Sequence, residues 1–317
     1  MKIVHIGLPK TGTTSLQQNV YPVLSSMKGY EWYRSKSNEL FSDIRDHIAK
    51  MRFGFSISKI RMDEKDFVSD EGLCGWDPYY WEEFAEKNLE AFGSDTHIIL
   101  TLRKPSDFLN SVYIQTCLHE GDVQKPKDFF LTKRYYSERL EIAKFSIEDF
   151  SYSKLIYFYT SRFEKVTIVK FEELKSLQFI KNIFSLNDED LEILKEIFVS
   201  EKKYNRAFSV RGQRIVFSLS RLLNLFGLSL RRHTSHRTLY ELKKLKDRKL
   251  KISNNYRPSK FKKIVLLIIK EFNWRHFIQE RVDRVFPYEK FNLNFKNLDI
   301  NIDTHDEEYK KIKSSLQ

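Results

Sequence analysis

The first chemistry that the sequence offers is an anion-binding loop, because the apolar run Ile3–Ile6 leads into the stretch GLPKTGTT, Gly7–Thr14. A strand that enters a glycine-containing turn and then a helix directs unpaired N–H groups and the positive end of the helix dipole at one point. The two glycines keep the GxxxxG spacing of a nucleotide-binding P-loop, but Thr13 stands where such a loop has its lysine. The sequence therefore favours a loop for a single phosphate over one for metal-assisted triphosphate hydrolysis.

This loop also carries the donors that a phosphate needs. Lys10 is its one lysine and is placed to reach a bridging oxygen of the ligand. Each hydrogen bond to a charged group contributes ~1.5–3 kcal/mol, so several give micromolar binding. The expected phosphate ligands are the backbone amides of Thr11, Gly12, Thr13 and Thr14, together with the hydroxyls of Thr13, Thr14 and Ser15.

The stretch PKTGTTSLQ resembles the 5′-phosphosulfate-binding loop of sulfotransferases that use 3′-phosphoadenosine 5′-phosphosulfate (PAPS). A second stretch, RKPSDFLNSVY at 103–113, follows the apolar run His97–Leu102 and resembles the 3′-phosphate motif of the same family. In that motif an arginine at a strand end and a serine eight residues later hold the 3′-phosphate, which points to Arg103 and Ser111. Arg103 offers a bidentate fork, and Ser111 would present its hydroxyl two turns along the following helix.

A third stretch, VSDEGLCG at 68–75, resembles the SxEGL segment of bacterial, glycan-modifying members, in which a carboxylate lies at the cleft. The resemblance makes Glu71 the expected general base, with Asp70 and then His5 as alternatives, and Lys10 the second catalytic residue. KFEEL at 170–174 and NRAFS at 205–209 resemble further family segments, so the likeness covers about the first two hundred residues. The catalytic histidine and the late RKG element of cytosolic small-molecule members have no clear match.

The hydrophobic pattern indicates the elements that must position these residues. Strands are predicted at Ile3–Ile6, near Phe67, at His97–Leu102 and at Val166–Phe171, and helices at Thr14–Ser25, Tyr79–Ala91, Ser106–His119 and Glu138–Phe163, the last broken near Ser151. This alternation predicts an α/β fold, with a P-loop NTPase-like parallel β-sheet flanked by helices. A PAPS-binding core is expected at 1–185 and a mainly helical, basic C-terminal region at 186–317.

The charge of the chain is concentrated in one region. The net charge is +12 overall, yet residues 202–263 alone contain 19 lysines and arginines against two acids, Glu241 and Asp247. Such a region attracts an anionic partner, which could be nucleic acid, an acidic glycan or an anionic membrane surface, unless it is simply a set of solvated helix faces. Two distant cysteines, Cys74 and Cys117, and the lack of a signal-peptide pattern predict a cytoplasmic protein, and the basic region would allow it to bind peripherally at the inner face of the membrane.

Taken with the resemblance, these features lead us to expect a sulfotransferase that moves the sulfuryl group of PAPS to a carbohydrate hydroxyl of a bacterial polysaccharide or glycolipid, without a metal and without a specific nucleic-acid partner. Two other classes stay open. A P-loop kinase or NTPase would need a lysine after Gly12 and a metal-binding acid, and a non-enzymatic protein would use the basic region to bind a polyanion or a membrane.

Overall fold

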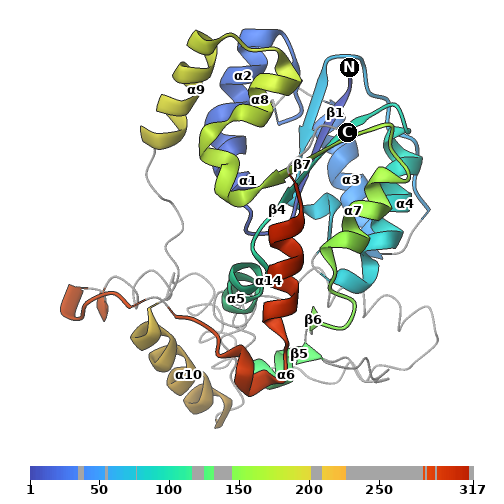
Figure 1. The fold of residues 1–317 in the computed structure, drawn as a ribbon. Helices are drawn as coiled ribbons and strands as arrows, with labels where there is room; N and C mark the ends of the chain where they lie inside the picture. The colour runs from blue at the N-terminus through green and yellow to red at the C-terminus, as the bar shows by residue number, and fades with distance from the viewer. Residues whose placement is uncertain are drawn as a thin grey trace, which may run out of the picture. The chain divides into compact units, whose positions relative to one another are not determined.

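The computed structural model describes ten segments of the chain (Figure 1): residues 1–34, 39–53, 56–75, 77–115, 125–131, 145–200, 209–225, 281–282, 284–289 and 291–313. Most of the basic region 202–263 and of the stretch NRAFS therefore lies outside the described residues, as do Cys117, His119 and the apolar run 264–269. No helix in the described segments is long and apolar enough to cross a membrane. The cytoplasmic location stays a prediction.

A parallel sheet of five strands forms the centre of the fold. Its order is β2-β3-β1-β4-β7, and every neighbouring pair is parallel. The strands are β1 (Ile3–Gly7), β2 (Glu31–Trp32), β3 (Asp66–Ser69), β4 (His97–Leu102) and β7 (Lys165–Lys170). β1, β3 and β4 are buried along their whole length, as expected for central strands of a sheet covered on both faces.

Helices cover both faces of the sheet (Figure 1). α1 (Thr13–Ser15), the π-helical turn η1 (Leu16–Val20) and α2 (Tyr21–Lys28) follow one another without a break in the helical backbone. The remaining helices around the sheet are α3 (Glu39–Phe53), α4 (Trp81–Phe92), α7 (Tyr152–Thr160), α8 (Gln178–Phe184), α9 (Asp188–Ser200) and α14 (Ile302–Lys311). The predicted α/β class with a parallel sheet flanked by helices is confirmed.

One layer of the core joins the helix after the first strand to helices far along the chain. Leu16, Val20 and Leu24 pack with Ile180 of α8 and Leu194 of α9 in a single buried apolar cluster. This cluster fixes the helix that begins at the anion-binding loop against one face of the sheet. Burial of such side chains contributes ~1.5–3 kcal/mol each, so the position of the loop is set by the core.

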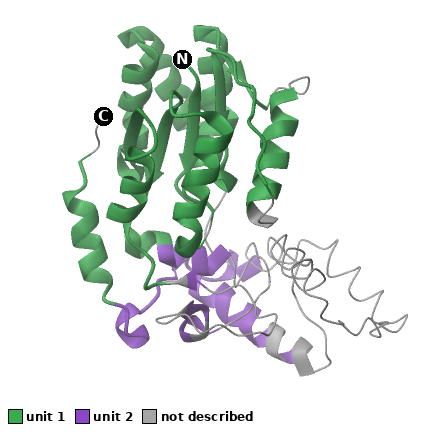
Figure 2. Cartoon of the chain, turned by 90° about the vertical axis from the view of Figure 1, so that its right-hand side faces the viewer, with its two compact units in different colours: residues 1–108, 146–203, 301–317 green, residues 109–145, 204–300 purple. Residues whose placement is uncertain are grey.

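The chain forms two compact units, each made from separate stretches of sequence (Figure 2). Unit 1 comprises residues 1–108, 146–203 and 301–317 and contains the sheet; unit 2 comprises 109–145 and 204–300. The described part of unit 2 includes the end of α5 (Pro105–Tyr113), α6 (Pro126–Phe129), β5 (Phe130–Leu131) and α10 (Val210–Leu225). The boundary expected at residue 185 falls within unit 1. That residues 186–317 complete or elaborate the core stays a prediction.

The four strands expected from the sequence are confirmed, each to within a residue or two. The helix predicted at Glu138–Phe163 is wrong at 145–151, its expected break near Ser151 coincides with the observed helix start, and residues 138–144 lie outside the described part of the chain. β6 (Phe145–Ser146) lies there, and the helix begins only at Tyr152, where the Ser151 hydroxyl accepts from the Lys154 amide. Phe145 pairs its ring with Phe130 of β5, with centroids 5.9 Å apart. This long-range aromatic pairing overrides a local pattern that is compatible with a helix.

Adjacent residues of α9 test how the core fixes this helix. We expect Leu194→Ala to lower the free energy of unfolding by about 2–5 kcal/mol, because Leu194 is fully buried and its loss leaves a cavity. Ile193→Ala, one position away and 43% exposed, should cost less than about 1 kcal/mol. Chemical denaturation of both variants measures the difference, and equal losses would contradict the orientation of α9.

Candidate functional site

The candidate site lies at the edge of the sheet where all five strands end. Because the strands are parallel, their carboxyl ends meet at one edge, and ligands of open α/β sheets bind at that edge. β1 continues into the loop that contains Lys10, and β4 ends next to Arg103. The other three strands are followed by Tyr33-Arg34, Asp70-Glu71 and Phe171. The sheet therefore brings the three sequence motifs to one place.

The backbone of the loop has the form of an anion cradle. Lys10 and Gly12 both have positive φ, 68° and 78°, so the chain turns sharply twice before α1 begins. The Thr11 hydroxyl donates to the Leu8 carbonyl at 2.6 Å and lies 3.3 Å from the Thr13 hydroxyl. α1 begins without a side-chain cap. The Ser15 amide donates to the Gly12 carbonyl at 3.1 Å, which leaves the amides of Thr13 and Thr14 as the N–H groups that α1 can offer to a ligand.

The hydroxyls of Thr11 and Thr13 face into the loop, and the second of these was an expected phosphate donor. Thr11 and Thr13 are fully buried, and a Cβ added at Gly7 would lie 2.3 Å from the Thr13 hydroxyl. These threonines therefore hold the inside of the turn. The Thr11 amide also donates to the Leu8 carbonyl, at 3.3 Å, so of these two residues Thr13 is the one whose backbone amide would contribute to a ligand. Thr14 is partly buried and Ser15 is exposed. A role of the Thr14 and Ser15 hydroxyls in binding stays a prediction.

The KFEEL segment at 170–174 packs against the loop at Gly12. Phe171 and Leu174 lie against Gly12, at 3.2 Å and 2.9 Å from the position of a Cβ added there. The Arg103 guanidinium stacks 4.7 Å from the centre of the Phe171 ring. Its Nη1 donates to the Lys10 carbonyl at 2.9 Å. One stack of side chains thus connects the ends of β4 and β7 to the tip of the loop.

Glu71 is the carboxylate that reaches the loop. It is partly buried, accepts a hydrogen bond from the Thr14 side chain and lies within the field of the Lys10 ammonium. Burial raises the pKa of Glu71 above its ordinary value, and the favourable charge of Lys10 only partly offsets this. A carboxyl group with a raised pKa beside a cation and a phosphate cradle has the properties of a general base.

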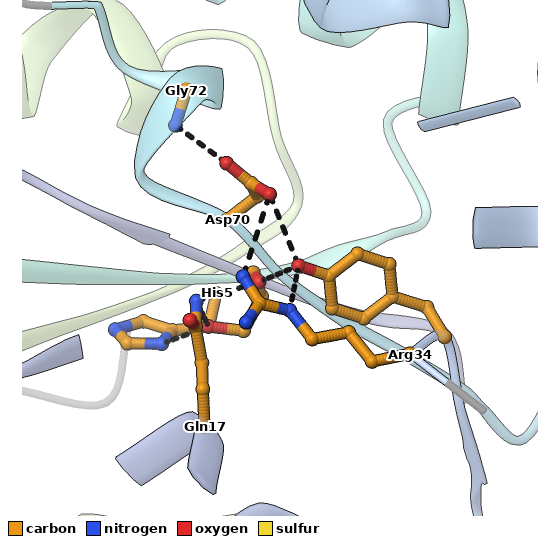
Figure 3. A network of polar contacts seen from close by, with 7 residues as sticks. His5, Gln17, Arg34, Asp70 and Gly72 are labelled. Atoms are coloured by element: carbon orange, nitrogen blue, oxygen red, sulfur yellow. Dashed lines mark hydrogen bonds and ion pairs between the residues drawn. The ribbon is translucent and has the colours of Figure 1, made fainter. Parts of the chain in front are cut away.

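Asp70 instead has a structural position (Figure 3). One carboxylate oxygen accepts from the Gly72 amide at 2.8 Å and thereby caps the turn that carries Glu71. The other accepts from the Tyr33 hydroxyl at 3.1 Å and lies 3.7 Å from a guanidinium nitrogen of Arg34. With both oxygens engaged and only 7% exposed, Asp70 is suited to fixing Glu71.

His5 lies inside the core, as the middle residue of β1. Its Nδ1 is 2.8 Å from the Ser69 hydroxyl and 3.0 Å from that of Tyr21, and its Nε2 is 2.6 Å from that of Thr101. Burial lowers the pKa of His5 to about 3. The ring is therefore neutral near pH 7, is sealed from solvent and connects three elements of the core.

The second motif is divided between the two units. Arg103 is in unit 1, where burial lowers the pKa of its guanidinium and the carboxylates of Asp107 and Glu172 oppose that shift. Ser111 is partly buried on α5, in the part of this helix that belongs to unit 2. Their shared grip on a 3′-phosphate stays a prediction. α5 itself begins at Pro105 and follows Arg103 as the sequence indicates.

Three further residues of the site were not foreseen. Gln17, in the π-helical turn η1, donates to the Ser69 carbonyl at 2.7 Å and so links the loop helix to the end of β3 (Figure 3). Arg34 donates through Nε to the Tyr33 hydroxyl at 2.8 Å and has a side chain 37% exposed. β2 is only two residues long, too short for any periodic signal, so the sequence did not reveal that Tyr33 and Arg34 follow a strand.

The fold and the loop define this chain as an α/β protein with a P-loop-like turn after its first strand. No protein-family model matches it, and no curated protein matches it significantly. Among solved structures it is similar to one described as "Crystal Structure of Sulfotransferase from Alicyclobacillus acidocaldarius", with a TM-score of 0.41 and 16% sequence identity. The match covers 72% of this chain and 96% of that chain. A shared activity does not follow from similarity of this size.

The described residues contain no cluster of three or more His, Cys, Asp or Glu side chains that is placed to hold a metal ion. Cys74 is buried and makes no disulfide.

Alanine substitutions at two glycines that both have left-handed backbone conformations test whether the loop packs on the side chains of Leu174 and Phe171. Gly29, with φ 66°, has open space around a new Cβ apart from Lys65 at 3.8 Å, so Gly29→Ala should cost only the left-handed strain, about 1–2 kcal/mol. Gly12→Ala adds contacts with Leu174 and Phe171 and should cost at least about 1 kcal/mol more. Denaturation curves of both variants measure this, and equal costs would show that the loop is not packed on these side chains.

Proposed function

We propose that this protein is a sulfotransferase that moves the sulfuryl group of PAPS to a hydroxyl group of an acceptor. The observation that carries the proposal is the junction of Glu71 with the loop: a carboxyl group with a raised pKa shares Thr14 and Lys10 with an anion cradle. Arg103, which braces the same loop through the Lys10 carbonyl, supplies the second cation that a bisphosphate nucleotide needs.

The loop suits one phosphate group. Thr13 takes the place of the lysine that would span the β- and γ-phosphates of a triphosphate, and its side chain is turned inward against Gly7. The backbone amides at the start of α1 and the Lys10 ammonium form a set of donors of about the size of one phosphate. A kinase or NTPase remains the alternative enzyme class, and it requires a different cation at this position.

Each residue then has a defined task. Bound PAPS would supply an activated sulfuryl group, with adenosine 3′,5′-bisphosphate as the leaving group. Lys10 would stabilise the negative charge that grows on the bridging oxygen, and the amides of Thr13 and Thr14 would hold the 5′-phosphate. Glu71 would accept the proton of the attacking hydroxyl, a task worth ~10²–10⁴ in rate. Asp70 would keep Glu71 in place by capping its turn.

The acceptor is proposed to be a carbohydrate hydroxyl of a polysaccharide or glycolipid. A carboxylate base suits the weakly acidic hydroxyl of a sugar when burial has raised its pKa, as at Glu71. The SDEGL stretch that carries Glu71 also resembles the segment of glycan-modifying sulfotransferases. The third alternative, a protein that only binds polyanions, gives no role to a base held at the loop.

Calorimetric titration with adenosine 3′,5′-bisphosphate tests the donor site. We expect micromolar binding by the wild type and a loss of at least tenfold in Lys10→Ala and in Arg103→Ala, because each removes a charge from the phosphate cradle. Arg162→Ala is the matched control, since Arg162 pairs only with surface carboxylates of Glu82 and Glu86 among its ionic contacts in the described structure. ATP with Mg²⁺ is titrated in parallel.

The outcomes of this titration separate the three classes. Tight binding of ATP with Mg²⁺, but not of the bisphosphate, would identify an NTPase or kinase. Binding that falls steeply with salt, to the bisphosphate and to other polyanions alike and equally in all variants, would identify a nonspecific polyanion binder. A melting curve for each variant ensures that loss of binding is not loss of fold.

The base is tested by Glu71→Gln. With an acceptor that supports turnover, we expect kcat to fall by about 10²–10⁴ while bisphosphate binding changes little. In the wild type, kcat should decline as the pH falls through the raised pKa of Glu71, because only the carboxylate accepts a proton, and this acidic limb should lie above the ordinary glutamate value of 4.5. Glu90→Gln, an exposed position on α4, is the control. An unchanged acidic limb in Glu71→Gln would assign the base to another group.

A further inference from the structure

Helix α10 of unit 2 exposes both arginine and aliphatic side chains on one side. Its exposed residues are Arg211, Arg214, Ile215, Ser218 and Leu222. At 100° per residue these five positions fall on a single arc of the helix, whereas buried Gly212, Gln213 and Val216 fall on the opposite arc. The inner arc packs into unit 2, and the outer arc presents two guanidinium groups together with two aliphatic side chains, Ile215 at 42% and Leu222 at 53% exposure.

A second segment of unit 2 extends this surface. The Arg211 guanidinium lies 4.2 Å from the centre of the Phe286 ring, and the Val210 amide donates to the Glu289 carbonyl at 2.9 Å. Phe286 and its neighbour Val285 are also exposed, Val285 by 71%. We name this surface the arginine-aliphatic face; its residues are Arg211, Arg214, Ile215, Ser218, Leu222, Arg284, Val285 and Phe286.

The charge of these two segments differs from that around other exposed apolar residues. By sequence, residues 209–225 and 284–289 contain four arginines and one acid, Glu289. In unit 1, by contrast, exposed Ile193 and Val199 lie on α9, whose sequence DEDLEILKEIFVS contains five acids and one lysine. The arginine-aliphatic face is therefore both apolar and cationic.

We propose that the arginine-aliphatic face docks on the interface of an anionic lipid bilayer. Arginines and large apolar side chains on one arc of a helix are the composition of interfacial helices, which bury their apolar groups at the boundary of headgroups and acyl chains. Arginine stems lie along that boundary while their guanidinium groups pair with lipid phosphates. A hydrated acidic polysaccharide or nucleic acid gives Ile215 and Leu222 no place to be buried, so exposed aliphatic residues favour a membrane.

Vesicle flotation with the full-length protein tests this docking. The wild type should float with vesicles of phosphatidylcholine and phosphatidylglycerol but not with phosphatidylcholine alone. Arg211→Gln/Arg214→Gln should lower the partition coefficient roughly twentyfold, since each arginine near an anionic surface contributes a factor of about five. Ile215→Ser/Leu222→Ser should lower it at least about tenfold through the lost apolar burial.

The matched control is Ile193→Ser/Val199→Ser, which removes exposed aliphatic groups of unit 1 and should leave flotation unchanged. Circular dichroism and bisphosphate titration of every variant show that the fold and the donor site are intact, so the outcome does not depend on the proposed activity. Equal flotation of Ile215→Ser/Leu222→Ser and wild type, or equal binding to zwitterionic vesicles, would overturn the proposal. The proposal would also be overturned if Ile215→Ser/Leu222→Ser still floated with the vesicles and still bound a soluble acidic polysaccharide as well as the wild type does.

Discussion

The parallel pairing of β1 with β3 on one side and β4 on the other is the constraint from which the site follows. It places the loop after β1 between the turn that carries Glu71 and the strand end that carries Arg103. A shift of one residue in either register would turn His5 out of contact with Ser69 and Thr101 and would move Glu71 away from Lys10 and Thr14. The buried hydrogen bonds of His5 therefore protect the geometry of the site, although His5 itself is remote from solvent.

At this edge of the sheet, opposite physical effects act on the carboxyl group of Glu71. Burial raises the pKa of Glu71, while Lys10 and Thr14 stabilise its charged form. A phosphate bound in the loop would compete for Lys10 and so remove part of the stabilisation of the carboxylate. Donor binding would then raise the basicity of Glu71 at the moment when a base is needed. The carboxyl group of Asp70, by contrast, accepts hydrogen bonds on both oxygens, from the Gly72 amide and the Tyr33 hydroxyl, and so is held in place.

The sequence was sufficient to predict the parallel sheet and the residues at the strand ends, because long apolar runs and a glycine loop are local signals. It was not sufficient for contacts made across the fold. Phe171 lies beneath Arg103 and against Gly12, a relation that only the pairing of β4 with β7 creates. Arg34 follows a strand of two residues, which no periodicity could mark. Residues 145–151 of the helix expected at Glu138–Phe163 are not helical for the same reason, since Phe145 pairs with a distant strand.

Helix α14 contacts segments that are synthesised much earlier than the helix itself. Its Asp306 accepts from the Ser106 amide at the start of α5 and pairs with Lys104 at 3.3 Å, and its Tyr309 donates to Glu172 beside the Phe171 stack. Asp306 is made 200 residues after Ser106, so residues made late in synthesis brace motifs made much earlier. The nascent chain can pair its strands as they leave the ribosome, but unit 1 can close only after residue 309 has emerged. Until then, Phe150 and Tyr152, which pack against His305 and Tyr309 of α14, would lack this cover, so the edge that carries the binding motifs would be the last part of unit 1 to close.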